Sequence, residues 1–108
     1  MASGVVRFKP TKIVNWHNVY GGATTTSIAD LYANASEGIT DYWLINTDLL
    51  TDWGTKTKTF YCDIRISKYG ALATITVFGC VESGAPLMWT CQKINSVYIW
   101  RKVTLETP

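Results

Sequence analysis

Hydrophobic and polar residues alternate with a period of two over most of the chain after residue 38. The alternation covers five runs, at residues 40–48, 58–67, 72–80, 86–92 and 97–104. A period of two is typical of β-strands, because successive side chains point to opposite faces of a sheet. The gaps between the runs are rich in Gly, Ser, Asn and Lys, which favour turns. The pattern therefore predicts an antiparallel meander.

One helix is predicted ahead of this meander, in the segment TTTSIADLYANASEG. Its apolar residues recur at the spacing of one helix face: Ile28, Leu31, Tyr32 and Ala35. Ser27 is placed to cap the amide three residues on, and Gly38 to end the helix in the left-handed region. A helix of about nine or ten residues is too short to stand alone in water, so it must pack on the sheet. The predicted fold class is α+β, mainly β, with one short N-terminal helix packed on an antiparallel sheet.

Alternation also assigns faces to the strands. In the second run, one side carries Phe60, Cys62, Ile64 and Ile66, and the other carries Tyr61, Asp63, Arg65 and Ser67. We expect the apolar side to receive the helix and the polar side to face water. The runs 72–80 and 97–103 are mostly apolar on both sides. Each of them is therefore expected to be covered on two faces, either by its own chain or by another subunit.

The segments before the helix, VVRFK and KIVNWHNVY, are predicted to form one or two further strands or extended arms. The first residues, MASG, are expected to be an added start, so the chain is expected to be a piece of a longer protein. Residues 1–25 are accordingly interpreted as lead-in strands that connect to a shaft, and residues 26–108 as the folded domain.

The composition of the chain argues against two classes of binding partner, nucleic acids and membranes. Of the 108 residues, 47% are hydrophobic and 17% are charged, which is far from the composition of a disordered chain. The net charge is +2, and the Lys and Arg residues are scattered, whereas nucleic-acid binders usually carry a basic stripe. The longest weakly polar run, residues 71–81, is too short to cross a bilayer. Neither nucleic-acid binding nor membrane insertion is predicted.

The residues that usually carry catalysis are sparse. The only histidine is His17, and the eight carboxylates are dispersed without a close pair. Asp48 and Asp52 bracket a loop, but the alternating carboxylates of a calcium-binding loop are missing. We therefore predict no enzyme activity, no metal and no cofactor.

Three cysteines, Cys62, Cys80 and Cys91, are widely spaced and form no C-x-x-C pair. Each lies in a strand-like run, where a free thiol behaves as a small hydrophobic side chain. Reduced structural cysteines are the first interpretation, and a single disulfide is the alternative.

Binding is the function for which the sequence offers most material. Trp53 lies in the polar loop TDWGTKT, where it is either a lid folded onto the core or an exposed stacking platform. Tyr69 and the outward residues Tyr61 and Arg65 would extend such a platform. Aromatic rings pack on the apolar faces of sugar rings, and charged side chains bind their hydroxyls. The four are candidate ligand-binding residues, although Tyr61 and Arg65 could equally cover a sheet face or form a subunit contact.

The order of these parts resembles a known family. The capped helix TSIADLYANASEG is followed by GITDYWLI, a meander, PLMWTCQK and a closing YIWRKV. This order is similar, over about residues 26–103, to the knob domains of phage tail fibres and R-type pyocin fibres. The matching positions with a structural role are Gly38, Tyr42, Trp100 and Arg101.

The resemblance implies a receptor-binding module, trimeric about a fibre axis, that attaches to a bacterial surface. Weak carbohydrate contacts would become effective through multivalency. The expected partners are two further copies of the chain, a bacterial surface glycan and other fibre segments. The expected location is the virion, outside the cell after release, following folding in the host cytoplasm with reduced cysteines. Two alternatives remain: a structural spacer or trimerisation domain of the same fibre, and an unrelated small carbohydrate-binding β-domain.

Overall fold

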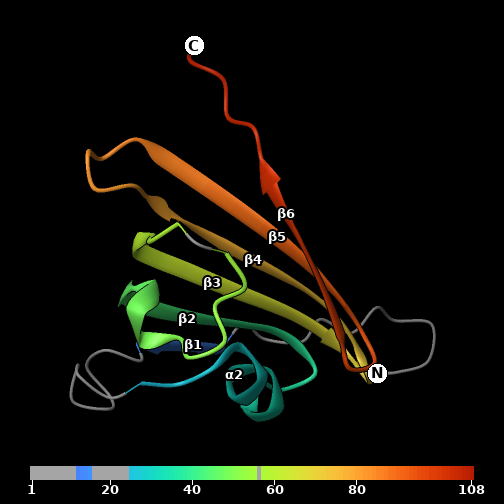
Figure 1. The fold of residues 1–108 in the computed structure, drawn as a ribbon. Coiled ribbons are helices and arrows are strands. Elements are labelled where there is room, and N and C mark those ends of the chain that lie inside the picture. Colours follow the sequence, from blue (N-terminus) through green and yellow to red (C-terminus); the bar gives the residue numbers. More distant parts are fainter. Residues whose placement is uncertain (1–11, 16–24, 56) are drawn as a thin grey trace, which may run out of the picture.

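A computed structural model describes residues 12–15, 25–55 and 57–108 of the chain. Within these residues, six strands form one sheet in the order in which they occur in the sequence (Figure 1). The elements are β1 (Lys12–Asn15), α2 (Ile28–Asn34), β2 (Gly38–Asn46), the 3-10 turn η1 (Thr47–Leu49), β3 (Phe60–Tyr69), β4 (Leu72–Cys80), β5 (Pro86–Ile94) and β6 (Val97–Val103). Strands β2 to β6 are antiparallel neighbours, which confirms the predicted meander with one short helix. Strand β1 pairs with β2 in parallel, so the sheet is mixed.

Of the predicted lead-in segment before the helix, residues 12–15 form a strand, β1. The rest of the segments VVRFK and KIVNWHNVY, with His17, lies outside the described residues. Among the residues that the structure describes, no helix combines the length and the hydropathy that a bilayer span requires.

The hairpin turns follow from residues that tolerate a left-handed backbone. Gly70 has φ 59° between β3 and β4, and Asn95 has φ 57° between β5 and β6. Both turns have only two residues, since Tyr69 pairs with Leu72 and Ile94 pairs with Val97. Two-residue hairpins need positive φ at the centre, which Gly and Asn adopt most readily. The turn chemistry read from the sequence thus places the strands in register.

Helix α2 is shorter than predicted. Ser27 caps it as expected, with its Oγ accepting a hydrogen bond from the Asp30 amide at 3.0 Å. The helix then ends at Ala35, whose backbone is extended, and Gly38 with φ 95° opens β2 instead of closing the helix. The ammonium group of Lys68 explains the early end, because it donates to the carbonyls of Tyr32 and Ala35 at 3.0 and 3.1 Å. Carbonyls satisfied in this way need no glycine cap.

One face of the sheet forms the hydrophobic core, and we call it the covered face. In Figure 1, α2 and the segment linking β2 to β3 lie on the viewer's side of the strands, over this face. Its fully buried side chains on β2, β3 and β4 include Leu44, Ile64, Ile66, Ile75 and Val77. Burying each such side chain contributes about 1.5–3 kcal/mol. The predicted apolar side of β3 does receive the helix, together with the long β2–β3 segment.

Phe60 departs from the predicted face assignment. It is only half-buried, because a β-bulge interrupts the β3–β4 pairing between Phe60 and Asp63. Tyr61 occupies the bulge with φ 53°. Gly79 lies opposite, and a Cβ on it would stand 2.3 Å from the Phe60 carbonyl oxygen. The bulge therefore depends on a glycine in the neighbouring strand, and it ends the alternation that the sequence suggested for Phe60.

Candidate contact face

The side of the sheet opposite α2 is not covered by any other described element, and we call it the open face. Cross-strand pairing arranges its side chains in four rows that run across the strands. The polar row contains Asp41, Arg65, Thr76, Thr90 and Arg101. The aromatic row beside it contains Trp43, Asp63, Phe78, Met88 and Val103.

Two further rows lie on the other side of the polar row. The mixed row contains Ile39, Ser67, Thr74, Gln92 and Ile99. The end row, next to the two short hairpin turns, contains Tyr69, Leu72, Ile94 and Val97. The open face is thus polar along its middle, mostly apolar in the aromatic and end rows, and mixed in the row between the polar and end rows.

Several large apolar side chains of the open face are exposed. The exposed fractions are 50% for Leu72, 42% for Phe78, 48% for Ile94, 57% for Val97 and 39% for Ile99. Monomeric proteins rarely expose contiguous apolar patches larger than a few hundred Å², and such patches usually mark contact surfaces. The prediction that β4 and β6 are covered on two faces holds for one face, which the chain itself covers; on the other face, no described element covers them.

A hollow of about 630 Å³ lies where the polar and aromatic rows meet. Its lining includes Asp41, Trp43, Asp63, Arg65 and Phe78. Arg65 donates through Nε and an η-nitrogen to both carboxylate oxygens of Asp41, at 2.8 and 3.0 Å. This bidentate hydrogen bonding, together with the charge of Asp41, raises the pKa of Arg65. Asp63 has no ion-pair partner among the described residues, so the hollow is locally acidic.

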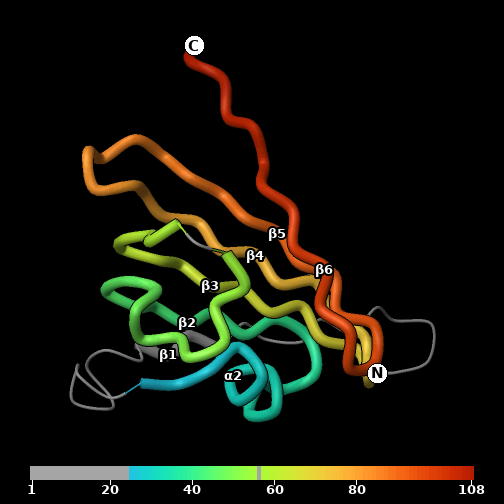
Figure 2. The backbone as a smooth tube through the Cα atoms, in the orientation of Figure 1, coloured from blue at the N-terminus to red at the C-terminus, as the bar shows by residue number. Residues whose placement is uncertain are grey.

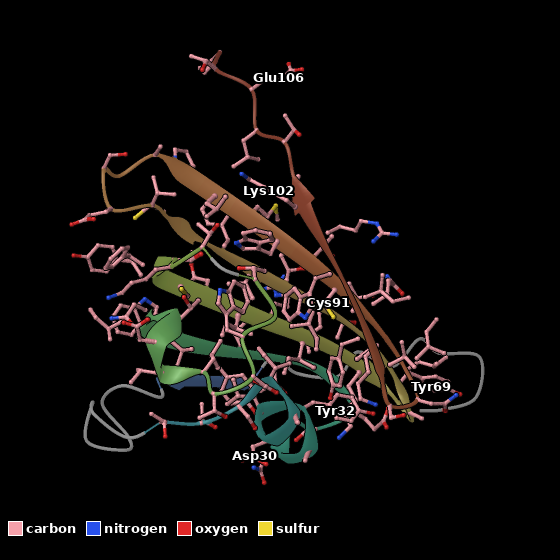
Figure 3. The ribbon with its side chains drawn as sticks, viewed as in Figure 1. Asp30, Tyr32, Tyr69, Cys91, Lys102 and Glu106 are labelled. Atoms are coloured by element: carbon pink, nitrogen blue, oxygen red, sulfur yellow. The ribbon has the colours of Figure 1, made fainter. Side chains whose placement is uncertain are left out.

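The four predicted ligand-binding residues do not form one platform. Arg65 lines the hollow, Tyr61 is 60% exposed at the bulge, and Tyr69 is 79% exposed at the β3–β4 turn. Figure 3 shows Tyr69 at one end of the sheet and Lys102 at the other. Trp53 lies on the covered face, away from the other three.

Trp53 acts as a lid over the core, which was the first of the two interpretations of its loop. Its ring contacts Trp89 and Trp100 edge-on, with centroids 5.8 and 5.0 Å apart. Its Nε1 donates to the carbonyl of Thr57 at 2.9 Å. Gly54 allows the loop to lie close, since a Cβ there would stand 2.9 Å from the Trp100 ring. The indole of Trp53 therefore packs on its own chain and does not form an exposed stacking platform.

No pattern in the sequence indicated the contact that joins this loop to the helix. The carboxylate of Asp52 accepts hydrogen bonds from the amides of Ile28 and Ala29, at 2.6 and 3.1 Å. These are orphan donors at the start of α2, where a negative charge is favourable. Since 23 or more residues separate the partners, no local motif could have indicated the pairing.

A second cluster that the sequence did not predict lies on the covered face, near the two short hairpin turns. The ammonium groups of Lys68 and Lys93 both lie over the ring of Tyr32, with their Nζ atoms 4.4 and 4.1 Å from its centroid. Lys93 is only 8% exposed, and its Nζ donates to the carbonyls of Ala71 and Asn95 in the two short turns. The signal in the sequence was a lysine at an inward position of β5, which requires such partners when buried.

The three cysteines are free thiols. Burial raises the pKa of Cys62 to about 12, with smaller contributions from Cys80 and Asp63. Burial likewise raises the pKa of Cys91 to about 11. Thiols of this kind are protonated at neutral pH and therefore poor nucleophiles.

Within the described ranges, no three His, Cys, Asp or Glu side chains come close enough to hold a metal ion. The carboxylates that bracket the β2–β3 segment are both engaged: Asp48 pairs with Lys58 at 2.7 Å, and Asp52 caps α2. Comparisons of the chain with protein-family models, with curated proteins and with solved structures found no match. Among the described residues, the strongest candidate for a functional surface is the open face with its acidic hollow.

Proposed function

We propose that this chain is a non-catalytic module of an attachment fibre of the kind carried by phage tails, assembled from several copies of itself. The observation that carries the proposal is the open face, where five large apolar side chains are 39–57% exposed. An apolar sheet face of this kind is stable in water when another protein surface covers it. The order of helix, meander and closing YIWRKV strand, which resembles fibre knob domains, supports the same role.

Attachment itself would use the aromatic side chains at the two ends of β3. Tyr61 and Tyr69 are 60% and 79% exposed, and they lie at the two ends of β3, at the margins of the open face. A tyrosine ring can pack on one face of a sugar while its hydroxyl meets water. Contacts of about millimolar strength become useful adhesion when several copies are held on one rigid support. The proposed partner is a bacterial surface glycan, and the proposed location is the virion.

The test is binding of the chain, coupled at several copies per bead, to an array of bacterial surface polysaccharides. We expect the beads to bind some of these glycans and uncoupled chain to bind them weakly. Tyr69→Ala should reduce the binding, whereas Ser83→Ala in the exposed β4–β5 loop should not. Release of sugar fragments from the array would contradict the non-catalytic assignment.

A structural spacer of the same fibre is the second candidate, and the apolar rows of the open face favour it. A spacer needs a stable contact between copies and no ligand. Self-association without binding to the glycan array or to intact bacteria would select the spacer over the attachment module.

A further inference from the structure

We propose that the open faces of two copies of this chain pack against each other, related by a two-fold axis that runs along β4. The inference rests on the proposed function in one respect, because both require a copy of the chain to cover the open face. It goes further by fixing which rows meet and how many copies take part. Two copies differ from the three that the resemblance to fibre knobs implies.

The size of the face is sufficient for such a pair. Five strands about 4.8 Å apart, with side chains of one face repeating about every 6.6 Å, make an area of roughly 600 Å². Two such faces bury roughly 1,200 Å² together, which is the lower limit for a specific stable interface. Two packed sheets stand about 10 Å apart, with their strands within about 30° of alignment.

The positions of the charged side chains in the polar row indicate which two-fold axis relates the two copies. β4 is the central strand of the antiparallel meander, so a two-fold rotation about it brings β2 of one copy over β6 of the other. Each row then faces the same row of the second copy. Asp41 meets Arg101 of the second copy, and the reciprocal pair forms at the other side of the axis.

At the ends of two other rows, apolar side chains meet in the same arrangement. Ile39 faces Ile99, and Trp43 faces Val103, whereas Asp63 faces Met88 of the second copy. Phe78 and Leu72, both on β4, each face their own counterpart across the axis. A two-fold axis perpendicular to the strands would instead place Asp41 over Ile39 and Arg101 over Ile99. That alternative covers the guanidinium of Arg101 with Ile99 and gives it no ion-pair partner, which is costly.

In this arrangement, a side chain of the second copy also enters the hollow. Arg101 of the second copy reaches it from above Asp41 and lies diagonally across from Asp63, which has no ion-pair partner among the described residues. Among the described residues of its own chain, the guanidinium of Arg101 donates only to the carbonyl of Trp100, at 3.3 Å, so it is available to a second copy. An acidic hollow on one side of the axis and an arginine on the other form a self-complementary surface.

The first experiment measures the mass of the full chain in solution by light scattering and sedimentation equilibrium, from about 1 to 500 μM. We expect a dimer that dissociates within or below this range, as for a small interface. Phe78→Asp places two like charges across the axis, and we expect it to raise the dissociation constant at least about 100-fold. Arg101→Asp should raise it about tenfold or more. Ser83→Asp adds the same charge in a loop away from the face and should leave the dimer intact.

The second experiment locates the axis by cross-linking with a short bismaleimide in a Cys80→Ser background. Thr76→Cys lies on the proposed axis and should cross-link to its counterpart. Thr90→Cys, in the same row but on β5, faces Arg65 and should not. Circular dichroism of each variant checks that it is folded.

The outcomes separate the two proposals. A trimer, or a dimer that is insensitive to Phe78→Asp, overturns the two-fold pairing and leaves the proposed function standing. A chain that stays monomeric at every concentration overturns both. Cross-linking through Thr90→Cys and not through Thr76→Cys also overturns the pairing.

Discussion

Gly79 shows how much a single residue decides at the scale of side chains. It lies opposite the β3 bulge, and a methyl group there would collide with the backbone oxygen of Phe60 at 2.3 Å. The backbone cannot move away without breaking the pairing on both sides. The bulge in turn holds Tyr61 in a left-handed conformation and presents its ring to solvent.

Gly79→Ala is therefore expected to lower the free energy of unfolding by about 2–3 kcal/mol, as overpacking in a rigid site does. Urea unfolding followed by tryptophan fluorescence measures the change. Gly84→Ala is the matched control, because Gly84 has φ 93° but open space around it. It should cost only about 1 kcal/mol from backbone strain. Equal losses in the two variants would contradict the proposed role of the close contact.

The buried thiols make stability depend on pH. The pKa values of Cys62 and Cys91 are raised to about 12 and 11, above the ordinary value of 9.0. Between pH 9 and 11 the unfolded chain releases these protons and the folded chain keeps them. The free energy of unfolding therefore falls as the pH rises above 9, by up to about 1.4 kcal/mol per pH unit for each thiol.

Urea unfolding at pH 8, 9 and 10 measures this decline. Cys62→Ala removes one of the two thiols, so its stability should fall less steeply above pH 9 than that of the unmodified chain. Parallel curves for the two proteins would show that other groups cause the decline. The buried thiols of Cys62 and Cys91 should also react slowly with alkylating reagents at pH 8.

At the scale of elements, α2 is stabilised by its contacts more than by its own length. Its seven residues are too few for a stable isolated helix. Ser27 and Asp52 satisfy amides at its start, and Lys68 satisfies carbonyls at its end. Only the Ser27 cap is local, and it is the only one of these contacts that the sequence predicted.

Asp52→Ala removes the carboxylate that joins the β2–β3 segment to α2. We expect a loss of about 1–2 kcal/mol in the free energy of unfolding, as for other helix N-caps. Asp52→Asn keeps a hydrogen-bond acceptor and should recover part of the loss. Chemical denaturation measures both, and an unchanged stability in Asp52→Ala would contradict the capping role.

Substitutions of Trp53 distinguish the two roles considered for its loop, a lid on the core and a platform for stacking sugars. Because its ring packs on Trp89 and Trp100, Trp53→Ala should lower the free energy of unfolding by about 3–5 kcal/mol. Trp53→Phe keeps part of the packing and should lose less. If the variants remain folded, their glycan binding should match that of the unmodified chain. Loss of binding with unchanged stability would restore the platform interpretation.

At the scale of the whole molecule, the sheet has one face sealed by its own chain and one without a cover among the described residues. Beyond β6, residues 104–108 are exposed and lead away from the sheet (Figure 2). β6 is an edge strand, and the inward side of its apolar pattern is explained by Tyr98 and Trp100 packing on the core. Its outward side belongs to the open face, which the proposed second copy would cover.

Self-association should therefore be visible in thermal unfolding. A contact formed only by folded chains stabilises them by mass action, so the midpoint temperature should rise with protein concentration. Differential scanning fluorimetry at 5, 50 and 500 μM measures the rise. In Phe78→Asp the midpoint should be independent of concentration, and a similar rise in that variant would place the contact elsewhere.

Local patterns in the chain determined the elements and most of their faces. Alternation set the five antiparallel strands, Ser27 set the start of α2, and Gly70 and Asn95 set the short turns. These features depend on interactions within a few residues, so they are legible in sequence. The strand ends agree within two residues for the same reason.

Only the tertiary structure decided which distant side chains meet. It placed Trp53 on the covered face and Arg65 in the hollow, and it joined Asp52 to the start of α2. Strand order and register determine the rows of the open face, and these are set by the packing of the whole sheet. No local spacing encodes such contacts, because their partners lie tens of residues apart and meet only once the core has formed.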